Sequence, residues 1–165
     1  MSFSSRLIVA AAVLVAAPAM AAKKAKVGEL ASAFTATTID KQKLWLEALT
    51  GRVVVLNYWA TWCAPCKAEM PIMDRFYRRH KAAGFELIGI TTEGSLPAYA
   101  LKKLDAVLTY PLAARSKGPS YASFDSVPTS FVIDRRGVLR EIKSESFDED
   151  EFNALILPLL AETAP

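Results

Sequence analysis

The chain has 165 residues, of which 52% are hydrophobic and 22% are charged, and its formal net charge at pH 7 is +3. This length and composition predict a single globular domain with a hydrophobic core of ordinary size. A net charge so near to neutral does not favour binding to nucleic acid or to an anionic membrane surface.

The first residues have the pattern of a secretory signal peptide. Arg6 precedes an apolar run over residues 7–17, and Ala19-Met20-Ala21 offers small residues at a cleavage site. We therefore expect residues 1–21 to be removed on export to the periplasm and residues 22–165 to form one domain. The alternative is an uncleaved segment that tethers the protein to a membrane, although the run is shorter than the roughly 20 apolar residues that span a bilayer.

Two short apolar stretches precede the centre of the chain. Residues 34–39 have the composition of a short strand, and the polar residues 40–43 form a turn after it. The apolar residues 44–46 follow, and we expect Trp45 to contribute packing rather than binding.

The centre of the chain combines a buried strand with a cysteine pair. Residues 53–58 are mostly β-branched and aromatic, which is typical of a strand buried on both faces. Cys63-Ala64-Pro65-Cys66 follows, and the pattern then becomes helical over residues 64–81. Unpaired N–H groups and the helix dipole favour a thiolate there and lower the cysteine pKa from about 8.5 to roughly 3.5–7.5. The pair is therefore predicted to be a redox-active dithiol.

Two other uses of the cysteine pair fit the sequence less well. A passive structural bridge is disfavoured because so short a loop would add little stability. A zinc site is disfavoured because the chain has only these two cysteines and one histidine, His80, which is expected to lie on the surface.

The second half of the chain alternates helices and strands. We predict a buried parallel strand over residues 86–91, a helix over 96–108, a strand over 130–134, an antiparallel strand over 138–143 and a last helix that begins at Asp148. Glu151 lies three residues after Asp148, which is the spacing of a capping box. Residues 109–125 are predicted to form a long loop, in which Tyr121 and Phe124 belong either to the core or to a binding surface.

A resemblance to a known family rests on four stretches, which are NYWATWCAPCKAEMP at residues 57–71, VPT at 127–129, FVID at 131–134 and Gly137. They resemble the TlpA/ResA/DsbE group of exported thiol–disulfide oxidoreductases. The resemblance implies a thioredoxin-like α/β fold, in which helices flank a central mixed sheet and an N-terminal β-hairpin is added. It also implies that the peptide bond before Pro128 is cis and that this proline faces the dithiol.

Cys63 is assigned as the nucleophile because it sits at the exposed mouth of the helix, while Cys66 points into the fold and resolves the mixed disulfide. Trp59 is expected to pack in the core. The residues expected to bind substrate and shape the active site are Trp62, Ala64, Pro65, Val127, Pro128 and Thr129.

Two polar residues are candidates for influencing proton transfer. Thioredoxin has a buried aspartate where this chain has Asn57, and an amide cannot act as a general base. Glu69 lies three residues after Cys66 and could influence the pKa of that thiol, unless it faces solvent as a surface glutamate.

The expected direction is reductive, because no histidine stands between the cysteines to stabilise a thiolate as in DsbA-like oxidants. A disulfide-introducing oxidant and a non-catalytic binding or chaperone module are the alternatives. A peroxiredoxin is disfavoured because Ala60 stands where its motif requires threonine. A copper carrier of the Sco type is disfavoured because it needs a Cys-x-x-x-Cys pair and a distant histidine.

The expected partners are disulfide-bearing proteins and an electron donor. An exported dithiol does not stay reduced unaided, and the resemblance implies a membrane thiol reductase of the DsbD type as the donor. Cytochrome c maturation and general thiol reduction both fit the client role. We expect a monomer, with no cofactor, no metal and no nucleic acid.

Overall fold

The computed structural model describes residues 24–94, 96, 98–118, 121 and 124–164. The expected signal peptide, residues 1–21, lies outside the described residues. Within the described part of the chain, no helix is both long enough and apolar enough to cross a membrane.

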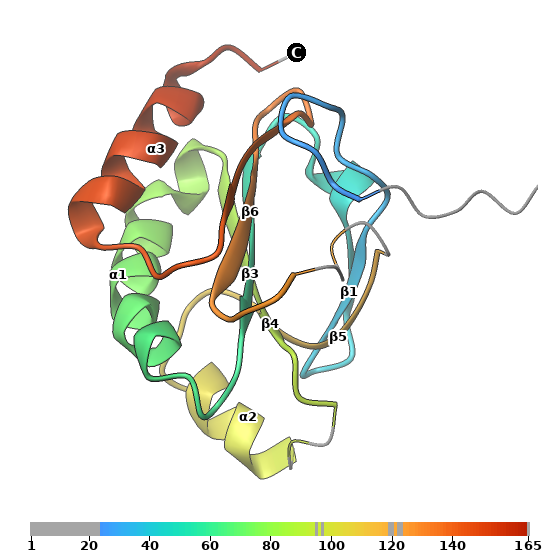
Figure 1. Ribbon diagram of the computed structural model, residues 1–165, viewed down its shortest axis with the longest axis vertical. Helices are drawn as coiled ribbons and strands as arrows, with labels where there is room; N and C mark the ends of the chain where they lie inside the picture. Colours follow the sequence, from blue (N-terminus) through green and yellow to red (C-terminus); the bar gives the residue numbers. More distant parts are fainter. Residues whose placement is uncertain (1–23, 95, 97, 119–120, 122–123, 165) are drawn as a thin grey trace, which may run out of the picture.

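A seven-stranded mixed sheet forms the centre of the described chain (Figure 1). Its order is β2-β1-β5-β4-β3-β6-β7, with β3 parallel to β4 and antiparallel to β6. The pairing of β1 with β2 is the expected N-terminal hairpin. Together with the mixed sheet and the helices beside it, this hairpin confirms the predicted α/β fold class. The strands are β1 (Thr35–Thr38), β2 (Lys43–Trp45), β3 (Val53–Trp59), β4 (Phe85–Thr91), β5 (Leu112–Lys117), β6 (Thr129–Ile133) and β7 (Leu139–Lys143).

Three helices pack around this sheet. α1 (Ala64–His80) and α3 (Glu149–Ala161) lie together along one face, while α2 (Ala98–Asp105) lies at one end, at the bottom of Figure 1. Two short 3₁₀ turns, Leu46–Leu49 and Lys81–Ala83, complete the elements. α2 is shorter than the helix predicted over residues 96–108.

β3 is buried on both faces, as its composition predicts, and separates two apolar layers. Val53 and Val55 belong to the cluster that includes residues of α1 and α3. Val54 and Leu56 belong to the cluster under the hairpin. The strand that leads to the cysteine pair is therefore buried at every residue.

The start of α3 has the predicted capping box. The backbone N–H of Glu151 donates to Oδ1 of Asp148 over 2.8 Å, and the N–H of Asp148 donates to Oε2 of Glu151 over 3.3 Å. The ring centroids of Phe147 and Phe152 lie 5.2 Å apart across this cap. The end of α1 at His80 agrees with the helix predicted over residues 64–81, and Gly84, in the left-handed region, ends the 3₁₀ turn that follows.

Residues 109–125 do not form the expected long loop, because they contain β5. β5 pairs antiparallel with β1 and parallel with β4. Its sequence LAARSK lacks β-branched residues, so pairing with its neighbours rather than intrinsic preference makes it a strand. Beyond it, Tyr121 is fully buried and therefore belongs to the core. Trp45 is half exposed, so its expected role in packing rather than binding stays a prediction.

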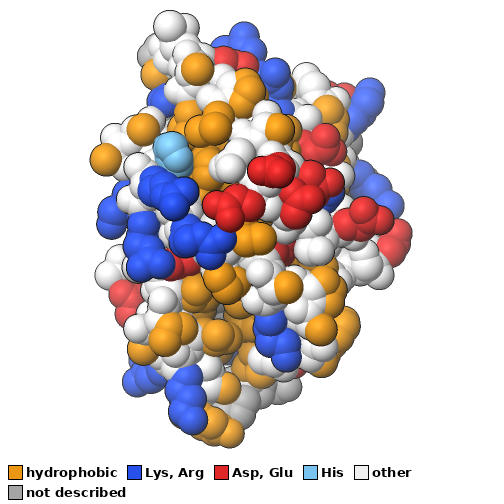
Figure 2. Space-filling view, turned by 90° about the vertical axis from the view of Figure 1, so that its left-hand side faces the viewer, with side chains coloured by type: hydrophobic (Ala, Val, Ile, Leu, Met, Phe, Trp, Pro, Cys, Tyr) orange, Lys and Arg blue, Asp and Glu red, His pale blue; other side chains and the backbone are white. Residues whose placement is uncertain are grey.

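The face of α1 and α3 mixes charges of both signs. Figure 2 shows basic side chains directly beside acidic ones on this face. Arg75 bonds to Glu149 over 2.8 Å, and Arg78 bonds to Asp74 over 2.7 Å. Arg75 and Arg78 are therefore each paired with a carboxylate of the same face.

Candidate active site

The cysteine pair lies between the end of β3 and the start of α1. Cys63 is the N-cap residue of α1, and its Sγ accepts a hydrogen bond of 3.1 Å from the backbone N–H of Cys66. The two residues form a disulfide. The local sequence explains the geometry, because Pro65 needs no hydrogen-bond partner in the first helical turn.

The expected exposure of Cys63 is wrong for this oxidised state. Cys63 is only 3% exposed and Cys66 is fully buried. Trp59, Met70 and Leu101 form an apolar cluster around the two residues, which confirms that Trp59 packs in the core. The assignment of Cys63 as nucleophile therefore depends on its place at the helix N-terminus and not on exposure.

The surface around the disulfide is formed by small and apolar side chains. Trp62 is 71% exposed, and Ala64 and Pro65 are exposed as well. An exposed tryptophan beside a buried disulfide offers an apolar contact area to an incoming protein.

The loop before β6 lies against the disulfide. The peptide bond between Val127 and Pro128 is cis, as expected. The carbonyl oxygen of Val127 lies 3.5 Å from Sγ of Cys63. Thr129 is buried, and its hydroxyl donates to the carbonyl of Ser126 over 2.7 Å, which holds the loop in place.

Glu69 is buried beneath the site and does not face solvent. Its Oε1 accepts a hydrogen bond of 2.8 Å from the side-chain amide of Asn57, and its Oε2 accepts one of 2.9 Å from the backbone N–H of Phe147. Burial raises the pKa of Glu69 from 4.5 to about 7, against the two hydrogen bonds and Lys143, which lower it. A carboxyl group that titrates near neutral pH thus lies one helical turn after Cys66.

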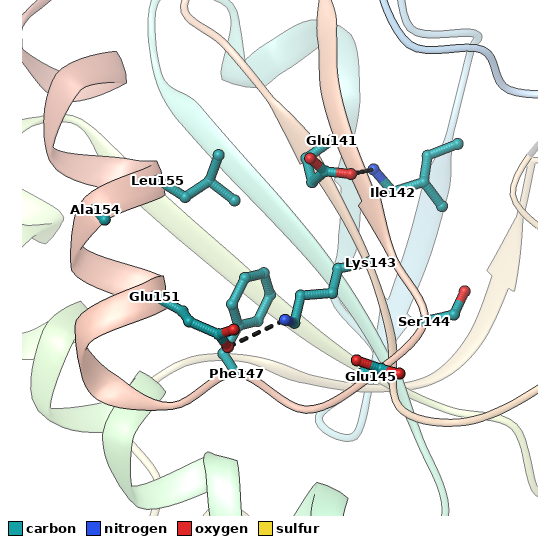
Figure 3. Close-up of a pocket in the computed structure, with 9 residues that line it drawn as sticks. All are labelled: Glu141, Ile142, Lys143, Ser144, Glu145, Phe147, Glu151, Ala154 and Leu155. Atoms are coloured by element: carbon teal, nitrogen blue, oxygen red, sulfur yellow. Dashed lines mark hydrogen bonds and ion pairs between the residues drawn. The ribbon is translucent and has the colours of Figure 1, made fainter.

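A shallow pocket lies on the outer side of Phe147 (Figure 3). Its floor includes Lys143, whose Nζ lies 5.1 Å from the ring centroid of Phe147 and 3.0 Å from Oε2 of Glu151. The sequence analysis missed Lys143, because its position near the site depends on the pairing of β7 with β6. This pairing places Lys143 opposite Ser130. Ser130 in turn accepts a hydrogen bond from the side-chain amide of Asn57.

A second carboxylate, Glu93, holds the loop before the cysteine pair. Its oxygens accept hydrogen bonds from the backbone N–H of Thr61 over 2.5 Å and from the Thr61 hydroxyl over 3.0 Å. Nothing in the sequence indicated this residue, since it lies 32 positions away in a loop after β4.

The structure brings the predicted site residues together at the end of β3, except that Asn57 and Glu69 lie in the layer beneath the disulfide. His80 lies at the far end of α1, half-buried, with its ring 4.2 Å from that of Phe76. Among the residues that the structure describes, no group of three or more histidine, cysteine or acidic side chains is placed to hold a metal ion.

Comparison with known proteins gives consistent results. The AhpC/TSA family matches residues 27–142. The thiol–disulfide oxidoreductase ResA of Bacillus thuringiensis subsp. konkukian is 34% identical over 82% of each chain. The thioredoxin-like protein YneN of Bacillus subtilis is 32% identical over 70% of this chain and 69% of that protein. A Chlorobium tepidum structure assigned as thiol:disulfide interchange protein DsbE has a TM-score of 0.71 and 26% identity, covering 84% of this chain and 100% of that one.

Proposed function

Since this chain belongs to the AhpC/TSA family and is a thiol–disulfide oxidoreductase of the ResA and DsbE type, we propose that it is an exported disulfide reductase that works through Cys63 and Cys66. The observation that carries the proposal is the cysteine pair at the N-terminus of α1, next to the carbonyl of Val127. Such a site can exchange disulfides with an extended protein segment bound along the Val127–Pro128 loop.

The proposed cycle starts from the reduced dithiol. The Cys63 thiolate attacks one sulfur of a partner disulfide, so that a mixed disulfide forms and the other partner sulfur leaves as a thiolate. Cys66 then loses its proton and attacks Sγ of Cys63, which restores the disulfide of this structure and releases the second partner sulfur. Two electrons pass from the dithiol to the partner, and the two released thiolates take up protons.

Glu69 is the proposed acceptor of the Cys66 proton. It is buried on the same face of α1 as Cys66, and its pKa of about 7 allows it to gain and lose a proton near neutral pH. Asn57 orients the carboxylate through its hydrogen bond but has no proton to exchange. Trp62, Ala64, Pro65, Val127, Pro128 and Thr129 form the proposed contact surface for the partner.

The reductive direction, the compartment and the partners are parts of the same proposal. Ala64 and Pro65 place no positive charge between the cysteines, which supports a reductase over an oxidant of the DsbA type. Cleavage of residues 1–21 would place the domain in the periplasm, where a membrane thiol reductase of the DsbD type would supply electrons. Apocytochrome c awaiting haem attachment is a proposed client, and the working unit is a monomer.

The reduction potential of the Cys63–Cys66 pair tests the direction. Equilibration with glutathione buffers should give a value near or below about −220 mV. An Ala64→His variant, which introduces a positive charge between the cysteines, should give a less negative value and serves as the control. A value near about −120 mV for the unmodified protein would contradict the reductase and favour a disulfide-introducing oxidant.

A further inference from the structure

A second surface feature lies beside the active site, between the hairpin and β5. It is a groove of about 810 Å³, and we call it the hairpin groove. Residues of five strands, β1 to β5, and of two loops contribute to it. Its charged and aromatic lining residues are Lys43, Trp45, Tyr58, Arg115, Lys117 and Phe124.

Strand register places the cations of the groove close together. Thr37 of β1 lies opposite Lys43 on one side and Arg115 on the other, and Thr35 lies opposite Trp45 and Lys117 in the same way. Adjacent strands are about 4.8 Å apart, so the three cations occupy neighbouring positions of one small area. Like charges so close together favour an anion between them.

No carboxylate of the described chain compensates these cations. Lys43, Arg115 and Lys117 are exposed, and none forms an ion pair with another described residue, unlike Arg75 and Arg78 of α1. The groove lining contains no acidic side chain. Glu93, whose neighbours in sequence line the groove, forms hydrogen bonds with Thr61 and no ion pair with these cations. The hairpin groove is therefore a basic surface whose three cations have no paired carboxylate among the described residues.

The groove also offers aromatic surface. Trp45 is half exposed, and the rings of Tyr58 and Phe124 lie 4.6 Å apart at its wall. Tyr58 itself is buried, so the accessible aromatic surface comes from Trp45 and the partly buried Phe124. Aromatic rings beside cations suit an extended segment that carries both acidic and apolar side chains.

The groove walls are continuous with the segments that hold the disulfide. Phe124 lies three residues before Val127, whose carbonyl touches Cys63. On the other side, the N–H of Thr92 donates to the carbonyl of Trp59 over 3.0 Å, just before the cysteine loop. A protein segment that reacts at Cys63 can therefore extend into the groove.

We propose that the hairpin groove binds an acidic segment of the protein whose disulfide reacts at Cys63. The inference deepens the proposed function and depends on it. It assigns a specificity to the site: partner disulfides flanked by glutamate or aspartate, with an apolar residue among them, react faster than neutral ones. Lys43, Arg115 and Lys117 act in recognition and take no part in the exchange of electrons.

The test uses two peptides, each with one cysteine held in a mixed disulfide with 2-mercaptoethanol. In the first peptide, four glutamates and a phenylalanine stand on each side of the cysteine. In the second peptide, glutamines replace the glutamates and the phenylalanines are kept. The reduced protein should have a kcat/KM about tenfold higher for the glutamate peptide, since each exposed charge pair contributes about 0.2–1 kcal/mol. The preference should shrink with added salt. A Lys43→Glu, Arg115→Glu, Lys117→Glu variant should lose the preference.

The matched control is an Arg79→Glu, Lys102→Glu, Lys103→Glu variant, which makes the same change in net charge at exposed residues outside the groove. It should keep the tenfold preference. Equal rates for both peptides, or equal loss in both variants, would overturn the proposal.

Binding to the oxidised protein separates this inference from the proposed function. The glutamate peptide with its cysteine replaced by serine should bind the oxidised protein, and the groove variant should bind it about tenfold more weakly. If binding behaves so while no peptide is reduced, the proposed function fails and the groove assignment stands. Equally tight binding of a single-stranded oligonucleotide of the same charge would overturn the assignment to a protein segment.

Discussion

Replacement of Glu69 by glutamine should change how the stability of the protein depends on pH. Burial raises the pKa of Glu69 from 4.5 to about 7 in the folded protein. Below about pH 4.5 the carboxyl group is protonated in both the folded and the unfolded state. Between pH 4.5 and 7 the folded state binds more protons, so the free energy of unfolding falls as the pH rises. The full effect, about 3 kcal/mol, is reached above pH 7.

Glutamine is a suitable replacement because the site can accommodate an amide. Oδ1 of Asn57 is buried and has no hydrogen-bond partner among the described residues, so rotation of that amide would let it accept from the new side chain. The variant therefore lacks the titrating group while a hydrogen bond to position 57 remains possible. Any constant difference in stability between the two proteins does not affect the test.

The assay is urea unfolding of both proteins at pH 5, 6, 7 and 8 with the disulfide intact. The free energy of unfolding of the unmodified protein minus that of Glu69→Gln should decrease by about 2.5 kcal/mol from pH 5 to pH 8, because all other titrating groups cancel. A difference that stays constant across this range would show that Glu69 does not titrate there, and the proposed proton acceptor would be wrong.

Two further changes test other parts of the site. Glu93→Ala should lower the free energy of unfolding by about 1–2 kcal/mol, because Thr61 loses the charged acceptor of its two hydrogen bonds. Urea unfolding measures this change. An unchanged midpoint would show that Glu93 does not stabilise the loop before the cysteine pair. Cys66→Ser should accumulate a covalent mixed disulfide with a partner on non-reducing gels, whereas Cys63→Ser should not. The reverse pattern would exchange the roles of the two cysteines, and full function of both variants would favour a binding module.

The sequence predicted those parts of the fold that local chemistry decides. The fold class, which the resemblance to the TlpA/ResA/DsbE group implied, is confirmed. The apolar run of β3, the cysteine pair at the helix start and the capping box at Asp148 are confirmed as well. Each depends on residues within one element or on a motif of fixed spacing. Those features can be recognised without knowledge of distant contacts.

The parts that were wrong or missed depend on contacts between distant segments. β5 is a strand because β1 and β4 pair with it, and its own sequence gives little sign of this. The burial of Glu69 depends on Phe147, which is 78 positions away. The contact between Glu93 and Thr61 likewise joins two loops. The residues next to Glu69 in the sequence are compatible with either a surface or a buried side chain. Only the assembled fold shows that this side chain is buried.

The burial of both cysteine residues has a consequence for how electrons are distributed between pathways. Exchange with a thiol requires an approach of three sulfur atoms in line, and the cover of Trp59, Met70 and Leu101 restricts that approach to the side of Trp62 and Val127. Bystander thiols and oxidants in solution should therefore equilibrate slowly with this disulfide, whereas a docked protein reaches it quickly. Because of this slow exchange, a reducing pathway could operate in the same compartment as an oxidising one without electrons passing directly from the first to the second.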